Sequence, residues 1–247
     1  MTTTYKNHEN QRFLCRKFAG CDERNGYNMK TKAVRLYGKD DIRLEEFELP
    51  EIKDDEILVK VVSDSICMST YKLVKQGKDH KRCPQNVDTN PIILGHEFAG
   101  DIVKVGAKWA DQFKPGQKFA QQPALNYKGS LASPGYSYEY FGGACTYCII
   151  PPEVMELGCL LNYDGESYFE ASLGEPMSCI IGGYHANYHT NKQNYNHAMG
   201  TKTDGNILIM GGCGPMGLGA VSYGLYTENK PKRIVVTDIS DERIERA

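Results

Sequence analysis

Three residues of this sequence carry the chemistry of a metal site, namely Cys67, His96 and Glu97. A thiolate, an imidazole and a carboxylate form a ligand set that suits zinc and leaves a fourth position for water or substrate. Neighbouring residues of a regular strand point to opposite faces, so His96 and Glu97 can reach one ion only if the chain turns there. Gly95 and Gly100 make such a turn cheap. An isolated His-Glu pair is also compatible with a plain strand end at the surface.

A second group of residues has the spacing of a dinucleotide site. The motif Gly212-x-Gly214-x-x-Gly217 follows the apolar stretch 207–210 and precedes a helix-like segment. Its glycines allow a tight turn, close approach to a pyrophosphate and close helix packing, and the helix N-terminus attracts phosphate. Asp238 ends the next apolar stretch, where a carboxylate binds ribose hydroxyls and repels a 2'-phosphate. The predicted cofactor-binding residues are Gly212, Gly214, Pro215, Met216, Gly217 and Asp238.

Two kinds of elements are expected to position these residues. Residues 29 to about 150 consist of short, β-rich segments separated by Gly and Pro, which predicts an irregular antiparallel barrel. The stretches 29–38, 40–50 and 55–67 are expected to be strands, so that Cys67 stands at the end of a strand. After residue 168 the spacing becomes helix-like and leads into a strand, turn, helix and strand, which is a βαβ unit. The fold class is therefore α/β with a β-rich part.

The bulk composition excludes several classes of function. With 40% hydrophobic residues, 24% charged residues and a net charge of −2, nothing favours nucleic acid or an anionic membrane as a partner. No apolar stretch approaches the roughly 18 residues that a membrane helix needs. The first 28 residues lack the apolar segment of a secretory signal, so a cytoplasmic protein is expected. Nine scattered cysteines indicate reduced thiols.

Taken together, these motifs resemble those of the medium-chain zinc-dependent alcohol and polyol dehydrogenases. The matching pieces are SICMST, GHEFAGDIVKVG, KPGQKF, GGACTYCIIPPEVM, LGEPMSC and GGCGPMGLGA. Within that family the sequence is most similar to the sorbitol dehydrogenase branch and to bacterial L-sorbose 1-phosphate reductases. The resemblance implies a GroES-like catalytic domain, an irregular β-barrel, over residues 29–170. An incomplete Rossmann NAD(P)-binding domain, the first part of a doubly wound parallel sheet, would follow over residues 171–247.

Residues 1–28 are polar and patternless, so we expect a disordered extension there, and Met29 is a hypothetical true start. The sequence ends at Ala247, where the helix after the second nucleotide strand begins.

The resemblance assigns roles to five residues. Cys67 and His96 would be zinc ligands. Glu97 matches a glutamate that is either a ligand or stands behind the metal, and Glu175 matches the position of a third ligand and could bind zinc or its water. Which glutamate is the third ligand stays open. Ser69 matches the hydroxyl that takes the proton of the substrate alcohol, so Ser69 and Glu175 are the expected catalytic residues and one catalytic zinc is expected.

Two positions depart from the family pattern. Thr70 replaces an aspartate that orients the zinc-bound histidine, which makes it a weaker acceptor for that ring. Lys72 replaces a relay histidine, so the proton would leave through water or another side chain.

The function expected from these residues is hydride transfer between NAD(P)(H) and a ketose phosphate or polyol. L-sorbose 1-phosphate and D-glucitol 6-phosphate are the first choice of pair, and a homo-oligomer is implied for the full-length protein. Two alternatives stay open: a zinc-free quinone or enone reductase of the same superfamily, and an inactive, truncated zinc-binding fragment.

Two further features have plain structural explanations. Cys145 and Cys148 would point to opposite faces of a strand and serve as packing thiols. Lys72 and Lys75 are three residues apart, which suits an exposed helix face, although the resemblance to sugar-phosphate reductases also suggests a phosphate-binding rim.

Overall fold

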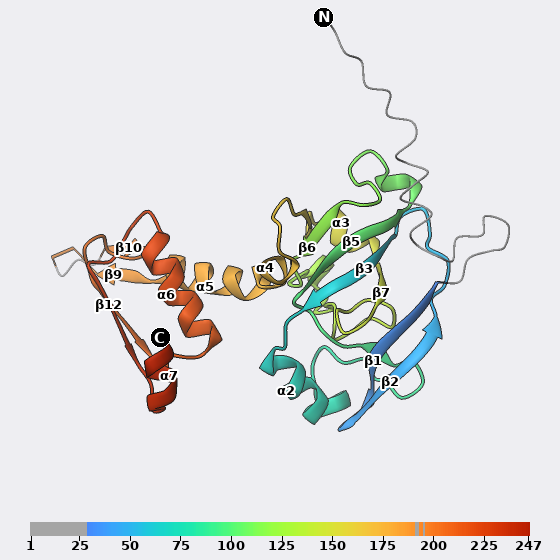
Figure 1. The fold of residues 1–247 in the computed structure, drawn as a ribbon, viewed down its shortest axis with the longest axis horizontal. Coiled ribbons are helices and arrows are strands. Elements are labelled where there is room, and N and C mark those ends of the chain that lie inside the picture. Colours follow the sequence, from blue (N-terminus) through green and yellow to red (C-terminus); the bar gives the residue numbers. More distant parts are fainter. Residues whose placement is uncertain (1–28, 191–192, 195) are drawn as a thin grey trace, which may run out of the picture.

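The structure is a computed structural model that describes residues 29–190, 193–194 and 196–247. The predicted extension over residues 1–28 lies outside the described residues. Figure 1 shows a larger body that contains β1 to β8 and a smaller body that contains β9 to β12, with α4 and α5 running between them.

The larger body consists of two antiparallel sheets. The first has the order β2-β1-β4 and contains β1 (Lys30–Gly38), β2 (Asp41–Glu48) and β4 (Ile92–Ile93). The second has the order β7-β3-β5-β6-β8 and contains β3 (Ile57–Asp64), β5 (Phe98–Val105), β6 (Lys118–Gln121), β7 (Tyr147–Ile150) and β8 (Leu160–Asn162). Within the described ranges the strands do not close into one barrel, which corrects the predicted barrel to two sheets. An isolated bridge between Ala33 and Cys145 joins them.

The core of the five-stranded sheet fixes the register of its central strands. Val59, Phe98 and Phe119 are almost fully buried, and burial of each such side chain stabilises the fold by about 1.5–3 kcal/mol. A register slip by one residue would turn these side chains to the other face. Asp64 at the end of β3 therefore pairs with Phe98 at the start of β5. This register brings the residues after β3 beside those before β5.

Short helices surround the larger body and lead away from it. Those within it are α2 (Met68–Gln76), the 3-10 turns η1 (Gly77–Asp79), η2 (Ala107–Trp109) and η3 (Tyr127–Gly129), and α3 (Pro152–Glu156). The link to the smaller body contains α4 (Tyr168–Ser172) and α5 (Gly174–Ala186). Helix α2 starts directly after its N-cap residue, Cys67.

The smaller body contains the predicted strand, helix and strand. Strands β11 (Asn206–Met210) and β12 (Arg233–Thr237) are parallel, α6 (Pro215–Tyr226) connects them and α7 (Asp241–Arg246) follows. A hairpin of β9 (Tyr188–Thr190) and β10 (His197–Met199) precedes them. Helices α5 and α6 pack against each other. Tyr184 of α5 donates a hydrogen bond of 2.6 Å to the carbonyl oxygen of Ala220 of α6.

Among the described residues, no helix combines the length and the apolar character needed to cross a membrane.

Candidate functional site

The chain turns at Gly95, immediately before the His-Glu pair. Gly95 has a φ of +87°, and a Cβ atom there would collide with Oδ2 of Asp64 and lie 2.6 Å from the amide nitrogen of Ala144. The prediction for Gly95 is therefore confirmed. The prediction for Gly100 was wrong, since this residue lies within β5, where a Cβ atom would collide with the carbonyl oxygen of Lys60 on β3. Gly100 thus permits the close approach of two strands.

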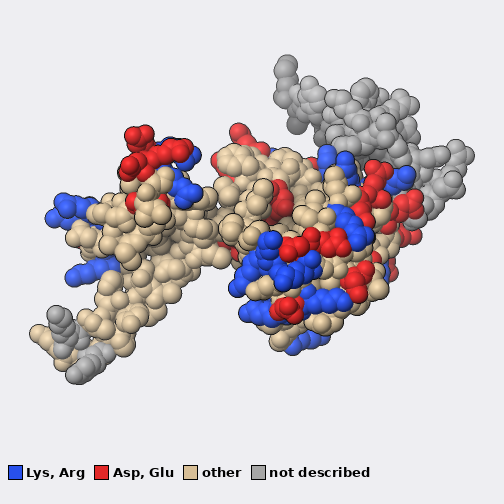
Figure 2. Space-filling view, turned by 90° about the horizontal axis from the view of Figure 1, so that it is seen from below, with Lys and Arg blue, Asp and Glu red and all other residues tan. Residues whose placement is uncertain are grey.

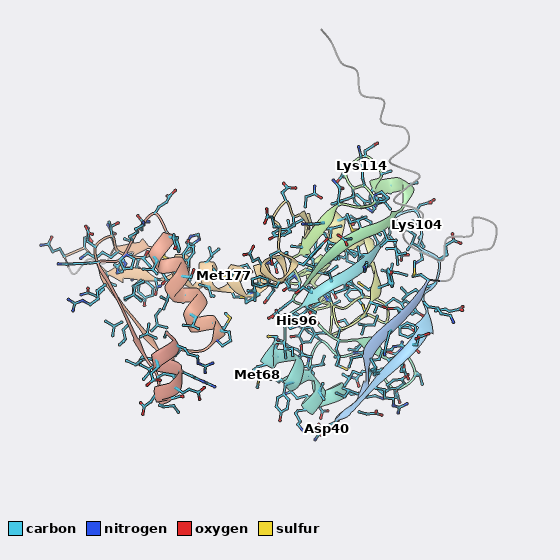
Figure 3. All side chains as sticks on the ribbon, in the orientation of Figure 1. Asp40, Met68, His96, Lys104, Lys114 and Met177 are labelled. Atoms are coloured by element: carbon cyan, nitrogen blue, oxygen red, sulfur yellow. The ribbon has the colours of Figure 1, made fainter. Side chains whose placement is uncertain are left out.

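The turn brings Cys67, His96 and Glu97 together. One ligand atom from each lies within 4.8 Å of the other two, and His96 and Glu97 are 5% and 6% exposed. Nε2 of His96 is 3.8 Å from Oε1 of Glu97. Figure 3 shows His96 at the end of the strands, above Met68 of α2 and on the side that faces α5. A sulfur, a nitrogen and an oxygen donor within this distance fit one zinc ion.

The charge balance of this cluster also fits a cation. Burial raises the pKa of Cys67 and of Glu175, and the charge of Glu97 raises the pKa of Glu175 further. The pKa of Asp64 is raised to about 7, mainly by burial. Burial lowers the pKa of His96, so the imidazole is held in the neutral form that binds metals. Several acids thus gather without an ion pair to any Lys or Arg that the structure describes, and a divalent ion would stabilise their charged forms.

Hydrogen bonds hold the two adjacent ligands in place. The hydroxyl of Ser65 donates to Oε2 of Glu97, and Nε2 of Gln121 donates to the carbonyl oxygen of His96 at 2.6 Å. Nδ1 of His96 is buried and has no hydrogen-bond partner among the described residues. The expected acceptor Thr70 therefore does not bind this ring, and the orientation of His96 depends on its packing.

Glu175 lies beside the cluster and is not one of its three members. It stands in the first turn of α5, its side chain interacts with that of Glu97, and the thiol of Cys179 donates to its Oε1 at 3.6 Å. The sequence left open which of the two glutamates is the third ligand. Glu97 is the one with a carboxylate oxygen within 4.8 Å of ligand atoms of both Cys67 and His96.

Ser69 lies next to the cluster and receives a hydrogen bond from a residue that the sequence did not single out. Its Oγ donates to Sγ of Cys67 at 2.9 Å and is 3.3 Å from Nε2 of His96. The hydroxyl of Tyr136 donates to Oγ of Ser69 at 2.6 Å, and Tyr136 is only 3% exposed. Tyr136 belongs to a segment rich in tyrosine, and nothing in its spacing distinguishes it from its neighbours.

The glycine-rich turn has the shape of a phosphate cradle. A Cβ atom at Gly217 would collide with the carbonyl of Gly212, and one at Gly212 would lie 2.6 Å from Ile209 and 2.8 Å from Val236. A Cβ atom at Gly214, the N-cap of α6, would meet nothing within 4 Å. Two of the glycines are thus needed for packing, and the third leaves open space at the helix N-terminus, as a pyrophosphate requires. Pro215 and Met216 form the first turn of α6.

Asp238 directly follows β12 and faces this turn. Its Oδ2 accepts a hydrogen bond of 3.2 Å from the amide of Cys213, and its Oδ1 accepts bonds from the amides of Ile239 and Ser240. These backbone donors lower the pKa of Asp238, the amide of Ser240 contributing most. The carboxylate is therefore charged and sits where the sequence places a ribose contact.

The structure changes the interpretation of two other features. The thiols of Cys145 and Cys148 interact with each other, so they do not point to opposite faces, because Cys145 lies before the regular strand β7 begins. The ammonium group of Lys75 pairs with Asp40 at 2.8 Å, which makes Lys75 part of the surface and leaves Lys72 as the member of the predicted pair without an ion pair among the described residues.

Comparison with known proteins identifies relatives of this fold. Residues 53–160 match the model of the alcohol dehydrogenase GroES-like domain. The structure is similar to that of 2R,3R-butanediol dehydrogenase from Bacillus subtilis, with a TM-score of 0.65 at 24% identity, over 87% of this chain and 60% of that one. At this identity the likeness shows the fold.

Among the curated relatives, two are named for sugar phosphates. The chain is 49% identical to L-sorbose 1-phosphate reductase of Klebsiella pneumoniae, over 88% of this chain and 53% of the relative. It is 52% identical to mannitol-1-phosphate 5-dehydrogenase of Aliivibrio fischeri, over 88% of this chain and 51% of the relative. The chain thus spans about half the length of the curated relatives that it matches.

Proposed function

We propose that this chain carries the metal centre and the first nucleotide-binding unit of a zinc-dependent oxidoreductase. The enzyme would transfer a hydride between NAD(P)(H) and a ketose phosphate or polyol. The observation that supports it most is the convergence of Cys67, His96 and Glu97 on one point, beside the hydroxyl of Ser69. The relatives' names support phosphorylated polyols as the substrate class, with L-sorbose 1-phosphate and D-glucitol 6-phosphate as the first pair to assay.

Cys67, His96 and Glu97 would hold the zinc ion, which as a Lewis acid supplies polarisation of a carbonyl oxygen or a lowered pKa of an alcohol. Glu175 beside them would accept a hydrogen bond from the ligand in the fourth position. The glycine-rich turn and Asp238 would hold the nucleotide, whose nicotinamide supplies the hydride. Asp238 favours NAD over NADP, because its charge repels a 2'-phosphate.

Ser69 would move the proton, and Tyr136 would position Ser69. The hydroxyl of Ser69 lies within hydrogen-bonding distance of the metal ligands. Its oxygen can take the proton of the substrate alcohol while its own proton passes to a water molecule, so that the histidine which Lys72 replaces is not needed. Tyr136 donates to Ser69 and thereby orients its hydroxyl.

The test measures zinc per chain and hydride transfer in the same preparation. We expect one zinc per chain, lost in Cys67→Ser, and retained in Cys179→Ser, a matched thiol on the neighbouring helix α5. The assay follows oxidation of D-glucitol 6-phosphate and of D-glucitol with NAD and with NADP. Enone reduction by a chain without zinc would instead favour the zinc-free reductase, and zinc binding without any hydride transfer would favour an inactive fragment.

A further inference from the structure

Helix α2 and the loop after it carry five cationic side chains close to the candidate metal site. The proposed hydride transfer does not use any of them. They are Lys72, Lys75, Lys78, Lys81 and Arg82. Lys75 pairs with Asp40 at 2.8 Å and Lys78 pairs with Asp88 at 3.0 Å. The other three form no ion pair with any residue that the structure describes. Figure 2 shows Lys and Arg gathered on the end of the larger body that faces the smaller one.

Arg82 is the member of this group that is partly buried. Its Nε atom is inaccessible to solvent and has no hydrogen-bond partner among the described residues. Its guanidinium carbon lies 5.2 Å from the centre of the Tyr136 ring. A buried charged donor without a partner is costly to maintain. Arg82 as a whole is partly exposed, so an anionic ligand can reach its guanidinium and offset the cost of the buried charge.

Tyr136 connects Arg82 to the metal centre. The Tyr136 ring centre is 5.0 Å from that of His96, and its hydroxyl donates to Ser69. The guanidinium carbon of Arg82 lies 5.2 Å from the centre of the same ring. The distance from this carbon to the centre of the His96 ring therefore cannot exceed the sum of the two distances to Tyr136. That span suits a substrate whose anionic group is attached near the carbon that reacts.

The positive charges of Lys72 and Lys81 act on His80, which packs against the same tyrosine ring. The ring of His80 stacks on Tyr136 with 5.4 Å between centres. The pKa of His80 is lowered by burial first, and then by the positive charges of Arg82, Lys72 and Lys81. The carboxylate of Glu97 belongs to the metal cluster and that of Glu175 lies beside it, so a dianion is repelled there and attracted on the side of Arg82. The charge pattern thus orients an anionic substrate.

We propose that Arg82, assisted by Lys72 and Lys81, binds the phosphate group of the substrate and selects phosphomonoesters of polyols over the free polyols. The planar guanidinium suits a bidentate contact with phosphate, and the two exposed lysines add charge. This inference rests on the proposed function, because it assigns the substrate class of the same site. Arg82 is then a specificity-determining residue that the sequence did not reveal.

The test uses the zinc-loaded 247-residue chain and titration calorimetry with D-glucitol 6-phosphate, D-glucitol and inorganic phosphate. We expect D-glucitol 6-phosphate to bind at least about tenfold more tightly than either of the others. In Arg82→Gln the affinity for D-glucitol 6-phosphate should fall about 30-fold, to near that for D-glucitol. Lys75→Gln, a control in helix α2 that removes a cation already paired with Asp40, should keep the affinity of the natural chain. If Arg82→Gln does not fold, the exposed pair Lys72→Gln and Lys81→Gln replaces it, with an expected loss of about tenfold.

Three results would overturn the assignment. They are an unchanged affinity in Arg82→Gln or in the folded lysine double variant, no preference for D-glucitol 6-phosphate over D-glucitol, and equal affinity for inorganic phosphate and D-glucitol 6-phosphate. Failure of the proposed function has a different outcome. A preference for the phosphomonoester that depends on Arg82, without hydride transfer in the assay above, would refute the oxidoreductase and support the phosphate site.

Discussion

At the scale of single residues, two nitrogen atoms in and near the candidate metal site have no partner. Nδ1 of His96 and Nε of Arg82 are both buried and without a hydrogen bond among the described residues. Burial of unpartnered polar atoms lowers stability, so such atoms are expected mainly where a ligand or a reaction uses the site. His96 of the metal cluster and Arg82 both lie next to the ring of Tyr136, which makes this tyrosine the central residue of the site.

Replacing Tyr136 by phenylalanine tests the hydroxyl chain. Tyr136→Phe keeps the buried ring and removes the hydrogen bond to Ser69. We expect kcat to fall about tenfold, as for the loss of one hydrogen bond near 1.4 kcal/mol, with zinc content and KM little changed. Steady-state kinetics with zinc analysis measures this. Tyr138→Phe, which removes a hydroxyl that donates to Glu153, is the control and should retain activity. Equal kcat in the two variants would contradict the role of Tyr136.

Asp64 makes the stability of the metal-free chain depend on pH. Its pKa is raised to about 7 in the folded state, from an ordinary value of 3.8, mainly by burial. Between these pH values the folded state keeps a proton that the unfolded state has released, so the free energy of unfolding falls as pH rises from about 4 to about 7. We expect a fall of roughly 2 kcal/mol from this group, after allowance for its partial exposure.

Urea unfolding in the presence of a chelator, at several pH values, measures this dependence. Asp64→Asn removes the titrating group and should flatten the curve in that range. Asp164→Asn replaces an aspartate outside the metal site and should leave the slope unchanged. An identical slope in Asp64→Asn and the natural chain would rule out Asp64 as its source.

At the scale of elements, turns and strand ends decide where the ligands meet. Gly95 and Gly116 have the same φ of +87°, but only Gly95 is surrounded by other atoms. Alanine substitutions at the two glycines therefore distinguish the cost of a positive φ from the cost of steric collision. In Gly116→Ala we expect a loss of about 1 kcal/mol in the free energy of unfolding, from φ alone. In Gly95→Ala the loss should reach about 3 kcal/mol or more, because Asp64 and the chain at Ala144 must move.

Chemical denaturation of both variants measures the difference, and zinc content reports the effect on the site. Gly95→Ala should also lose zinc, because the turn positions His96 and Glu97. Equal destabilisation of the two variants, with zinc retained, would show that the space around Gly95 adjusts easily.

In the proposed enzyme, the turn after β12 would control the choice of nucleotide. Asp238→Ser removes the charge that would repel a 2'-phosphate, and the smaller side chain weakens the contact with the amide of Cys213. We expect the ratio of the Kd for NADPH to that for NADH to fall about tenfold. Fluorescence titration with both reduced nucleotides measures the ratio. Asp241→Asn, in the first turn of α7, is the matched control and should change it little. No change in Asp238→Ser would exclude Asp238 from ribose recognition.

At the scale of the whole molecule, the two bodies differ in how completely their apolar side chains are buried. The larger body encloses Val59, Phe98 and Phe119 almost fully. In the smaller body α6 covers only one face of the β11 and β12 pair. The other face exposes Leu208, Met210 and Val235, with exposed fractions of 59%, 79% and 41%. An apolar sheet face of this kind promotes association.

We therefore expect the 247-residue chain to self-associate at high concentration through this face. Leu208→Lys with Val235→Lys should shift the chain toward the monomer in analytical ultracentrifugation. Leu157→Lys, which adds a charge at an exposed leucine of the larger body, should leave the association unchanged. A natural chain that sediments as a monomer at every concentration would contradict this expectation.

Much of this organisation could be predicted from the sequence, because it depends on local pattern. Strand β12 leads directly into Asp238 as predicted, the glycine-rich turn lies between β11 and α6, and Cys67 lies shortly after β3, which already ends at Asp64. Alternation, glycine spacing and helix starts are properties of neighbouring residues, so they are visible along the chain. The ligand types also predict zinc chemistry, since a Cys, a His and a Glu suit such a site, and zinc binding stays a prediction.

Other features depend on contacts between residues that are far apart in the chain, and only the tertiary structure decided them. The register of β3 and β5 selects Glu97 as the member of the donor cluster and leaves Glu175 beside it. The packing of Tyr136 against His96 and Ser69 joins residues separated by 40 positions or more. Local spacing carries no information on which distant side chains share a space, because that is set by the packing of the core. The partly buried position of Arg82 next to Tyr136 has the same origin.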